Sequence, residues 1–325
     1  MDTEKPYEGM SIGQESRMLV RNLIHWICSE ENPLSPFGWC CPSGGDYRSR
    51  PGIRPHFRTV IFLAVLIMAV SSNPKKARAQ SPWWITRQVA AELRENGVAR
   101  ETDRAMLWFE PGVLSDEQIN EFAELVNCGV LDIEETLKIE PRRDVKIRFF
   151  ISSKGGISQT MGRTIFLPIE RVANRTAPYL HETTHAVAPC PDCPMWFSEG
   201  LASYVQSYIS ENVRGYDGAV FTRRGNRGID HDAARWIASD RGQAVLPFLG
   251  THEQPPQIAY DRSNVAAPYY VMSQSLIKFM VEKIGMEKLR EVWSSSHFED
   301  TLVSVTGKDS EAWKEDWLEA LVAAK

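Results

Sequence analysis

The segment HETTH at residues 181–185 holds the side chains best suited to chemistry. On a helix, residues four positions apart lie on one face, so His181 and His185 can direct both imidazole rings at one metal ion. Glu182 lies beside them, where its carboxylate can act as general base on a metal-activated water. The pattern indicates a hydrolytic zinc site. The alternative is a surface helix that carries two histidines and no metal.

The sequence around this segment favours a helix. Thr176 can cap the helix, and Pro178 suits the first turn, where backbone N–H groups have no acceptor within the helix. Pro189 would end the helix. Five residues are expected to form the inward stripe: Tyr179, Leu180, Thr183, Ala186 and Val187.

A third metal ligand is expected, because a catalytic zinc ion takes three protein ligands and keeps one position for water. Glu199 is the candidate, within the segment PMWFSEGLASYV at residues 194–205. Pro194 can begin a second helix, and Gly200 would let that helix approach the first one closely. Ser203, one turn after Glu199, could support a ligand through a hydrogen bond.

These two segments together resemble the gluzincin zinc metallopeptidases, and most of all the small peptidase MA-like domains. Residues 269–290 and 300–322 resemble later helices of that family, so the resemblance covers roughly residues 105–322. It implies one Zn²⁺ ion held by His181, His185 and Glu199. It also implies that Glu182 is the general base and proton shuttle.

The resemblance further implies a downstream donor to the oxyanion of the tetrahedral intermediate. Tyr270 is the first candidate because it begins the matching helix, Tyr269 is the second, and His231 is the third. Each could instead be an ordinary core or surface residue. In gluzincins an edge strand pairs with the substrate backbone, and residues 164–168 are expected to be that strand. The sequence has no motif that would anchor a free amino terminus, which favours an endopeptidase.

Cys190 and Cys193 lie between the two metal segments, as Cys-Pro-Asp-Cys. A local disulfide is the first interpretation, and it leaves Cys128 unpaired. The alternative is a closed site in which both cysteines and both histidines bind zinc, which would be structural and catalytically silent. A non-catalytic zincin-fold protein, acting in binding or envelope assembly, is therefore the competing functional hypothesis.

Three β-rich runs are expected to be strands: 105–109, 145–151 and 164–169. Pro168 places the last of them at a sheet edge or at a strand end, because proline cannot donate to the hydrogen-bond ladder. Residues 83–95 are expected to be helical and to stop at Gly97.

Ser115 and Gln118 form a capping-box pattern that begins a helix running to about Ile139. A small sheet followed by helices predicts the α+β class. With the resemblance, the expected fold is zincin-like, a small N-terminal mixed β-sheet lobe followed by a mostly helical C-terminal lobe.

Residues 59–70, TVIFLAVLIMAV, form an uncharged run that is short for a membrane span. With basic residues before it and Ala77-Arg78-Ala79 after it, the run is typical of a signal peptide. An uncleaved membrane anchor and a buried core segment are the alternatives. We expect an N-terminal extension at 1–56, a signal peptide or anchor at 57–79 and a peptidase domain at 80–325, exported to the periplasm or the extracellular space.

The composition is that of a globular protein. Of 325 residues, 43% are hydrophobic, which is ample for a packed core, and the net charge of −5 does not favour nucleic acid as a partner. We expect the charged residues to form a solvated surface. The expected partner is a peptide or protein substrate, with membrane association through residues 59–70 as a further option.

Overall fold

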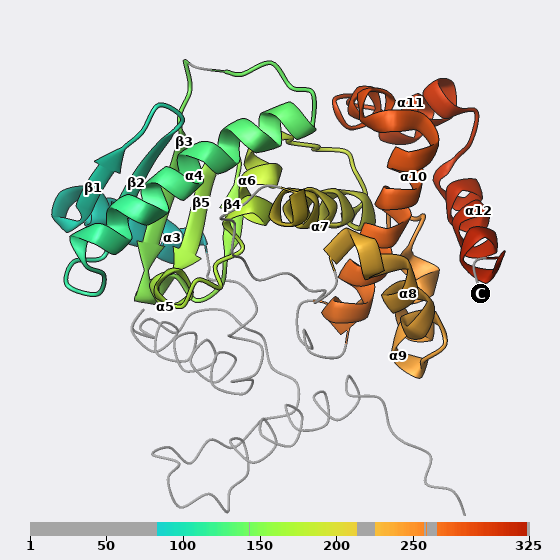
Figure 1. Ribbon diagram of the computed structural model, residues 1–325, viewed down its shortest axis with the longest axis horizontal. Coiled ribbons are helices and arrows are strands. Elements are labelled where there is room, and N and C mark those ends of the chain that lie inside the picture. Colours follow the sequence, from blue (N-terminus) through green and yellow to red (C-terminus); the bar gives the residue numbers. More distant parts are fainter. Residues whose placement is uncertain (1–82, 143, 213–224, 257, 259–264, 324–325) are drawn as a thin grey trace, which may run out of the picture. The chain divides into compact units, whose positions relative to one another are not determined.

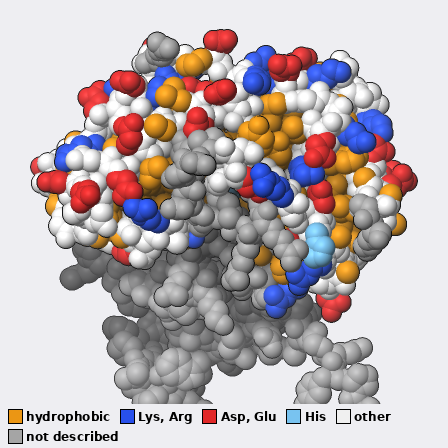
Figure 2. Space-filling model, viewed as in Figure 1, with side chains coloured by type: hydrophobic (Ala, Val, Ile, Leu, Met, Phe, Trp, Pro, Cys, Tyr) orange, Lys and Arg blue, Asp and Glu red, His pale blue; other side chains and the backbone are white. Residues whose placement is uncertain are grey.

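The computed structural model describes residues 83–142, 144–212, 225–256, 258 and 265–323. The expected N-terminal extension (1–56) and targeting segment (57–79) lie outside these residues. Among the described helices, none is both long and apolar enough to cross a membrane. Acidic and basic side chains are interspersed over the face seen in Figure 2, as expected for a solvated surface.

Within the described residues, a mixed sheet has the strand order β1-β2-β3-β5-β4 (Figure 1). Its strands are β1 (Val98–Glu101), β2 (Ala105–Phe109), β3 (Ile147–Ser152), β4 (Gln159–Met161) and β5 (Thr164–Pro168). Strands β2, β3 and β5 run parallel, while β1 and β4 are antiparallel additions at the two edges. The three predicted strands are confirmed. The two edge strands were not predicted, because both are short and alternate with polar residues.

Helices cover both faces of this sheet. Along β3, Phe149 and Ile151 join the main core beneath α4 (Asp116–Thr136), while Phe150 points to the other face. There it packs with residues of α3 (Trp83–Asn96). The predicted capping box is confirmed, since the side chains of Ser115 and Gln118 each accept the other's backbone N–H.

Strand β5 is not the edge of the sheet, contrary to the expectation for residues 164–168. Strand β4 pairs with it, with Thr160 opposite Ile165, so β4 is the edge strand. Pro168 does lie at a strand end, where it also precedes the short helix α5 (Ile169–Ala173). The turn at Gly162 and Arg163 folds β4 back onto β5, and β4 then lies in contact with α6, which carries the metal segment.

After β5 the described chain is helical, which confirms a mixed α+β fold. The elements are α6 (Tyr179–Val187), α7 (Met195–Asn212), α8 (Gly225–Ile237), α9 (Asp240–Val245), α10 (Ala267–Trp293), α11 (Phe298–Thr306) and α12 (Ser310–Ala323). Gly285 breaks α10 with a φ of 80°, a conformation that favours glycine.

Helix α7 packs closely along α10. A Cβ atom at Gly200 would lie 2.6 Å from the carbonyl oxygen of Ser273 and 2.9 Å from Cγ1 of Ile277. Gly200 therefore permits close approach to α10, and the expectation that it serves the approach to α6 is wrong. A buried amide strengthens the same contact, since Nε2 of Gln274 donates to Oγ of Ser207 on α7.

Gly200→Ala tests this packing. The added methyl group would have to displace main-chain atoms of α10, so the free energy of unfolding in urea should fall by about 1–3 kcal/mol. Ser210→Ala, in the last turn of α7, is the control and should change it by less than about 0.5 kcal/mol. Equal stability of Gly200→Ala and the wild-type protein would contradict the close contact.

Candidate metal centre

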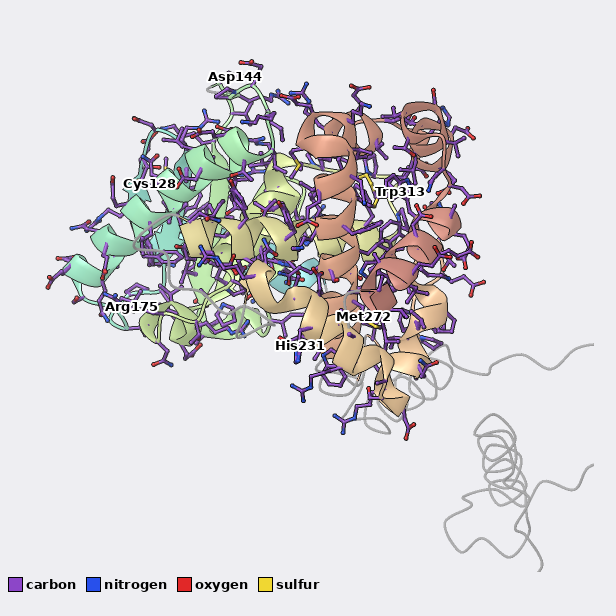
Figure 3. The ribbon with its side chains drawn as sticks, turned by 45° about the vertical axis from the view of Figure 1, so that its right-hand side comes forward. Cys128, Asp144, Arg175, His231, Met272 and Trp313 are labelled. Carbon is purple, nitrogen blue, oxygen red and sulfur yellow. A yellow bond between two sulfur atoms is a disulfide. The ribbon has the colours of Figure 1, made fainter. Side chains whose placement is uncertain are left out.

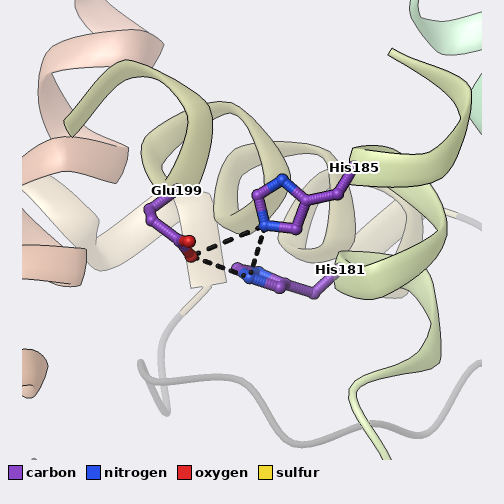
Figure 4. A group of neighbouring side chains, drawn as sticks. All are labelled: His181, His185 and Glu199. Carbon is purple, nitrogen blue, oxygen red and sulfur yellow. Dashed lines mark hydrogen bonds and ion pairs between the residues drawn. The ribbon is translucent and has the colours of Figure 1, made fainter. Parts of the chain in front are cut away.

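His181 and His185 on α6 and Glu199 on α7 converge on one point (Figure 4). Oε2 of Glu199 lies 3.1 Å from Nε2 of His181 and 3.6 Å from Nε2 of His185. The two Nε2 atoms are 3.2 Å apart. The three side chains predicted to be metal ligands are thus brought together, although they come from two helices.

These separations suit a metal ion. Two ligand atoms at about 2.0–2.1 Å from a tetrahedral zinc ion are about 3.3 Å apart, by the geometry of the tetrahedron. The observed 3.1, 3.2 and 3.6 Å edges are close to that value on all three sides. The group can therefore hold a metal ion as one face of a coordination polyhedron, with room for a further ligand.

The electrostatics of the group are those of an anion between two imidazoles. Burial by itself would raise the pKa of Glu199, but the neighbouring His185 and His181 outweigh burial and hold this pKa well below its usual range. Burial by itself would lower the pKa of His185, but Glu199 and then Glu182 outweigh it and raise this pKa. A divalent cation bound there would compete with protons for these nitrogen and oxygen atoms.

Helix α6 is fixed from α7 as well as from its own sequence. The N-cap position is Pro178, which makes no side-chain cap, so the expectation that Thr176 caps the helix is wrong. Oε1 of the buried Gln206 on α7 instead accepts the backbone N–H of His181. The five residues of the predicted inward stripe are all buried.

Glu182 is buried and is held from the sheet. Oγ1 of Thr160, on edge strand β4, lies 2.7 Å from Oε2 of Glu182 and 2.9 Å from its main-chain oxygen. Sequence reasoning missed Thr160, because β4 has too few residues for a recognisable strand pattern. Recognising that β4 pairs with β5 would have been needed to place Thr160 near the metal segment.

A cleft of about 730 Å³ opens onto the metal group. Its walls include Thr160 from β4, Glu182 from α6 and Tyr270 from α10. This volume is within the range of small-molecule and peptide-segment sites. The candidate base, the candidate ligands and one candidate oxyanion donor therefore face the same space.

The three oxyanion-donor candidates differ in their positions. Tyr270 lines the cleft, with its ring centroid 6.1 Å from that of His181. Tyr269 is fully buried and does not line the cleft, and burial, followed by the charge of Glu199, raises its pKa. His231 is on α8 with a side chain that is 61% exposed, beside Asp232 and outside the cleft lining (Figure 3). The structure therefore does not bring His231 to the site.

Ser203 does not support a metal ligand. Its Oγ is buried, and within the described residues it has no hydrogen-bond partner. Gln206, three residues after Ser203 on α7, makes the contact with α6 instead, by accepting the backbone N–H of His181.

Cys190 and Cys193 form a disulfide in the loop between α6 and α7. In the described part of the chain, the metal-binding group contains no cysteine. The closed site of two cysteines and two histidines is thus not what the structure contains. Oδ2 of Asp192, inside this loop, accepts the backbone N–H of Phe298 at the start of α11, which ties the loop to the helical part.

Cys128 is a free thiol whose pKa is raised by burial and then by Glu124.

Comparisons with protein-family models, with curated proteins and with solved structures found no match for this chain. The geometry and chemistry of the cleft are therefore the basis for a functional assignment.

Metal binding is the first property to measure. The full-length protein should bind one zinc ion per chain at the cleft, and His181→Ala or Glu199→Ala should weaken zinc affinity by more than about 100-fold, since loss of a mere supporting partner costs 10–100-fold. Titration with a competing chromophoric chelator measures this affinity. His231→Ala is the matched control and should bind zinc as the wild-type protein does. Equal affinity of His181→Ala and His231→Ala would contradict the site.

The disulfide can be mapped chemically. When the protein is denatured, alkylated without reduction and digested, the peptide with Cys190 and Cys193 should carry no alkyl group and should lack two hydrogen masses. Cys128 should be alkylated in the same sample and serves as the control. Alkylation of both Cys190 and Cys193 would show two free thiols and would reopen the cysteine-ligand alternative.

Proposed function

We propose that this protein is a zinc-dependent peptidase of the gluzincin type, with a zincin-like fold. The observation that carries the proposal is the convergence of His181, His185 and Glu199 on one cleft in which Glu182 is also held. Two histidines and one glutamate with a position left open form a donor set of catalytic zinc sites, whereas structural sites are closed by four protein ligands.

The residue types match the metal and the reaction. Imidazole nitrogen and carboxylate oxygen are ligands that zinc accepts. A bound zinc ion would lower the pKa of a water ligand and polarise the scissile carbonyl group. The two carboxylates have different tasks, since Glu199 is directed at the histidines and Glu182 at the cleft and at Thr160.

Glu182 acts as the general base and then as the general acid. It takes a proton from the attacking water and delivers it to the nitrogen of the leaving amine. Tyr270 is the proposed donor to the oxyanion of the tetrahedral intermediate, because of the three candidates it alone is placed in the cleft lining.

Edge strand β4 is proposed to bind the substrate backbone. It lies at one edge of the described sheet, and its residues line the same cleft as Glu182. An edge strand offers backbone N–H and C=O groups that an extended peptide can pair with. Such binding needs no contact with a free terminus, which favours cleavage within a chain.

An exported location is part of the proposal. The apolar run at 59–70 and the small-residue pattern after it are typical of a signal peptide. The disulfide between Cys190 and Cys193 supports the same location, because such bonds persist in oxidising compartments. The substrate would then be a peptide or protein of that compartment.

Glu182→Gln tests the proposal. The variant should keep its zinc and lose activity on an unstructured protein or a peptide library by about 10²–10⁴-fold, the usual contribution of a general acid–base. Glu170→Gln, an exposed carboxylate on α5, is the control and should stay active. 1,10-Phenanthroline should stop cleavage by the wild-type protein.

Two outcomes would contradict it. Undiminished cleavage by Glu182→Gln would remove the proposed base. Stoichiometric zinc in a wild-type protein that cuts no member of the library would favour the competing hypothesis, a non-catalytic zincin-fold binding protein.

A further inference from the structure

The hydroxyl of Thr160 lies between two oxygens of the same residue. Its Oγ1 is 2.7 Å from Oε2 of Glu182 and 2.9 Å from the main-chain oxygen of Glu182. A hydroxyl has one hydrogen to donate and two lone pairs that accept. It can therefore donate to only one of these two oxygens at a time.

The contact with Oε2 fixes the position of the Glu182 carboxylate, and the contact with the main-chain oxygen fixes where the Thr160 hydroxyl lies relative to α6. One side chain of strand β4 therefore contacts both the backbone and the carboxylate of Glu182.

This partner matters because Glu182 is buried, with 7% of its surface exposed. Among the described residues, no other side chain hydrogen-bonds its carboxylate. Leaving a buried carboxyl group without a hydrogen bond costs free energy, so a Glu182 side chain that lost this bond would turn toward another donor. Thr160 therefore decides where the Glu182 carboxylate points.

We propose that Thr160 is a positioning residue that holds the Glu182 carboxylate toward the cleft. The inference rests on the proposed function of Glu182. Edge strand β4 then has two tasks, since its middle residue orients the base while its backbone is available to the substrate. Thr160 itself does not bind the metal and exchanges no proton with the substrate.

The alternative is that the Thr160 hydroxyl only joins β4 to α6. Valine has the same shape as threonine and lacks the hydroxyl, and serine keeps the hydroxyl and lacks the methyl group. Thr160→Val and Thr160→Ser therefore separate hydrogen bonding from packing. Thr164→Val is the matched control, because Thr164 lies on neighbouring strand β5, outside the cleft lining.

In Thr160→Val we expect kcat on a cleaved library peptide to fall about 10–100-fold, the usual size of a supporting-partner effect. KM and zinc content should stay close to wild type. Thr160→Ser should restore kcat to within about threefold of wild type, and Thr164→Val should not change it. If Thr160→Val does not fold, Thr160→Ala against Thr160→Ser makes the same comparison.

Crystal structures of the full-length zinc-loaded variants give a second readout that does not depend on activity. In Thr160→Val the Glu182 carboxylate should leave its wild-type position or occupy more than one, and in Thr160→Ser it should return. A Glu182 carboxylate that keeps its position in Thr160→Val would overturn the proposal. The proposal would also be overturned if Thr160→Val lost activity through a higher KM or through loss of zinc. It would be overturned as well if Thr160→Ser did not restore the activity.

The two proposals can fail separately. A wild-type protein that cuts no peptide overturns the proposed function, and the role of Thr160 in positioning a general base falls with it. The crystal structures still decide whether Thr160 holds Glu182. A wild-type protein that cuts peptides, together with a fully active Thr160→Val, overturns the role of Thr160 alone.

Discussion

The contact between α6 and α7 is the constraint on which the rest of this structure depends. Three ligand atoms from these helices have to lie within 3.1–3.6 Å of one another, although buried carboxylates and imidazoles do not gather without a partner charge. A relative shift of the helices by one side-chain length would separate Glu199 from the histidines. The relative position of α6 and α7 therefore has to be fixed by contacts other than those among the three ligand side chains.

Several independent contacts fix this relative position. Gln206 of α7 accepts the backbone N–H of His181, so the second helix caps the first. Gly200 lets α7 lie against α10, where Gln274 anchors it through Ser207. The disulfide cross-links the loop between the helices, and Asp192 hydrogen-bonds that loop to the start of α11. The candidate ligands are thus held by contacts between α6 and α7, by α10 and through the loop, which is the preorganisation that a metal site needs.

What could be predicted from the sequence was the part governed by local periodicity. His181 and His185 at helical spacing predict a shared face, and the capping box at Ser115 predicts where α4 begins. The contacts made between distant segments could not be predicted in this way. The partner of Gly200 is Ser273, which is far along the chain, and Thr160 reaches Glu182 only because β4 folds back onto β5. Glu199 was predicted from the need for a third ligand, and the resemblance agreed with it. The cleft shows which of the oxyanion-donor candidates lies near the metal group, since only Tyr270 of the three lines it.

The central claim is that three side chains, two histidines and one glutamate, hold a zinc ion that has no sulfur ligand. X-ray absorption spectroscopy at the zinc edge of the loaded full-length protein tests it most directly. The account predicts only nitrogen and oxygen neighbours at about 2.0–2.2 Å, with imidazole scattering from two histidines. A sulfur neighbour at about 2.3 Å would contradict it, since the metal would then be bound by cysteine.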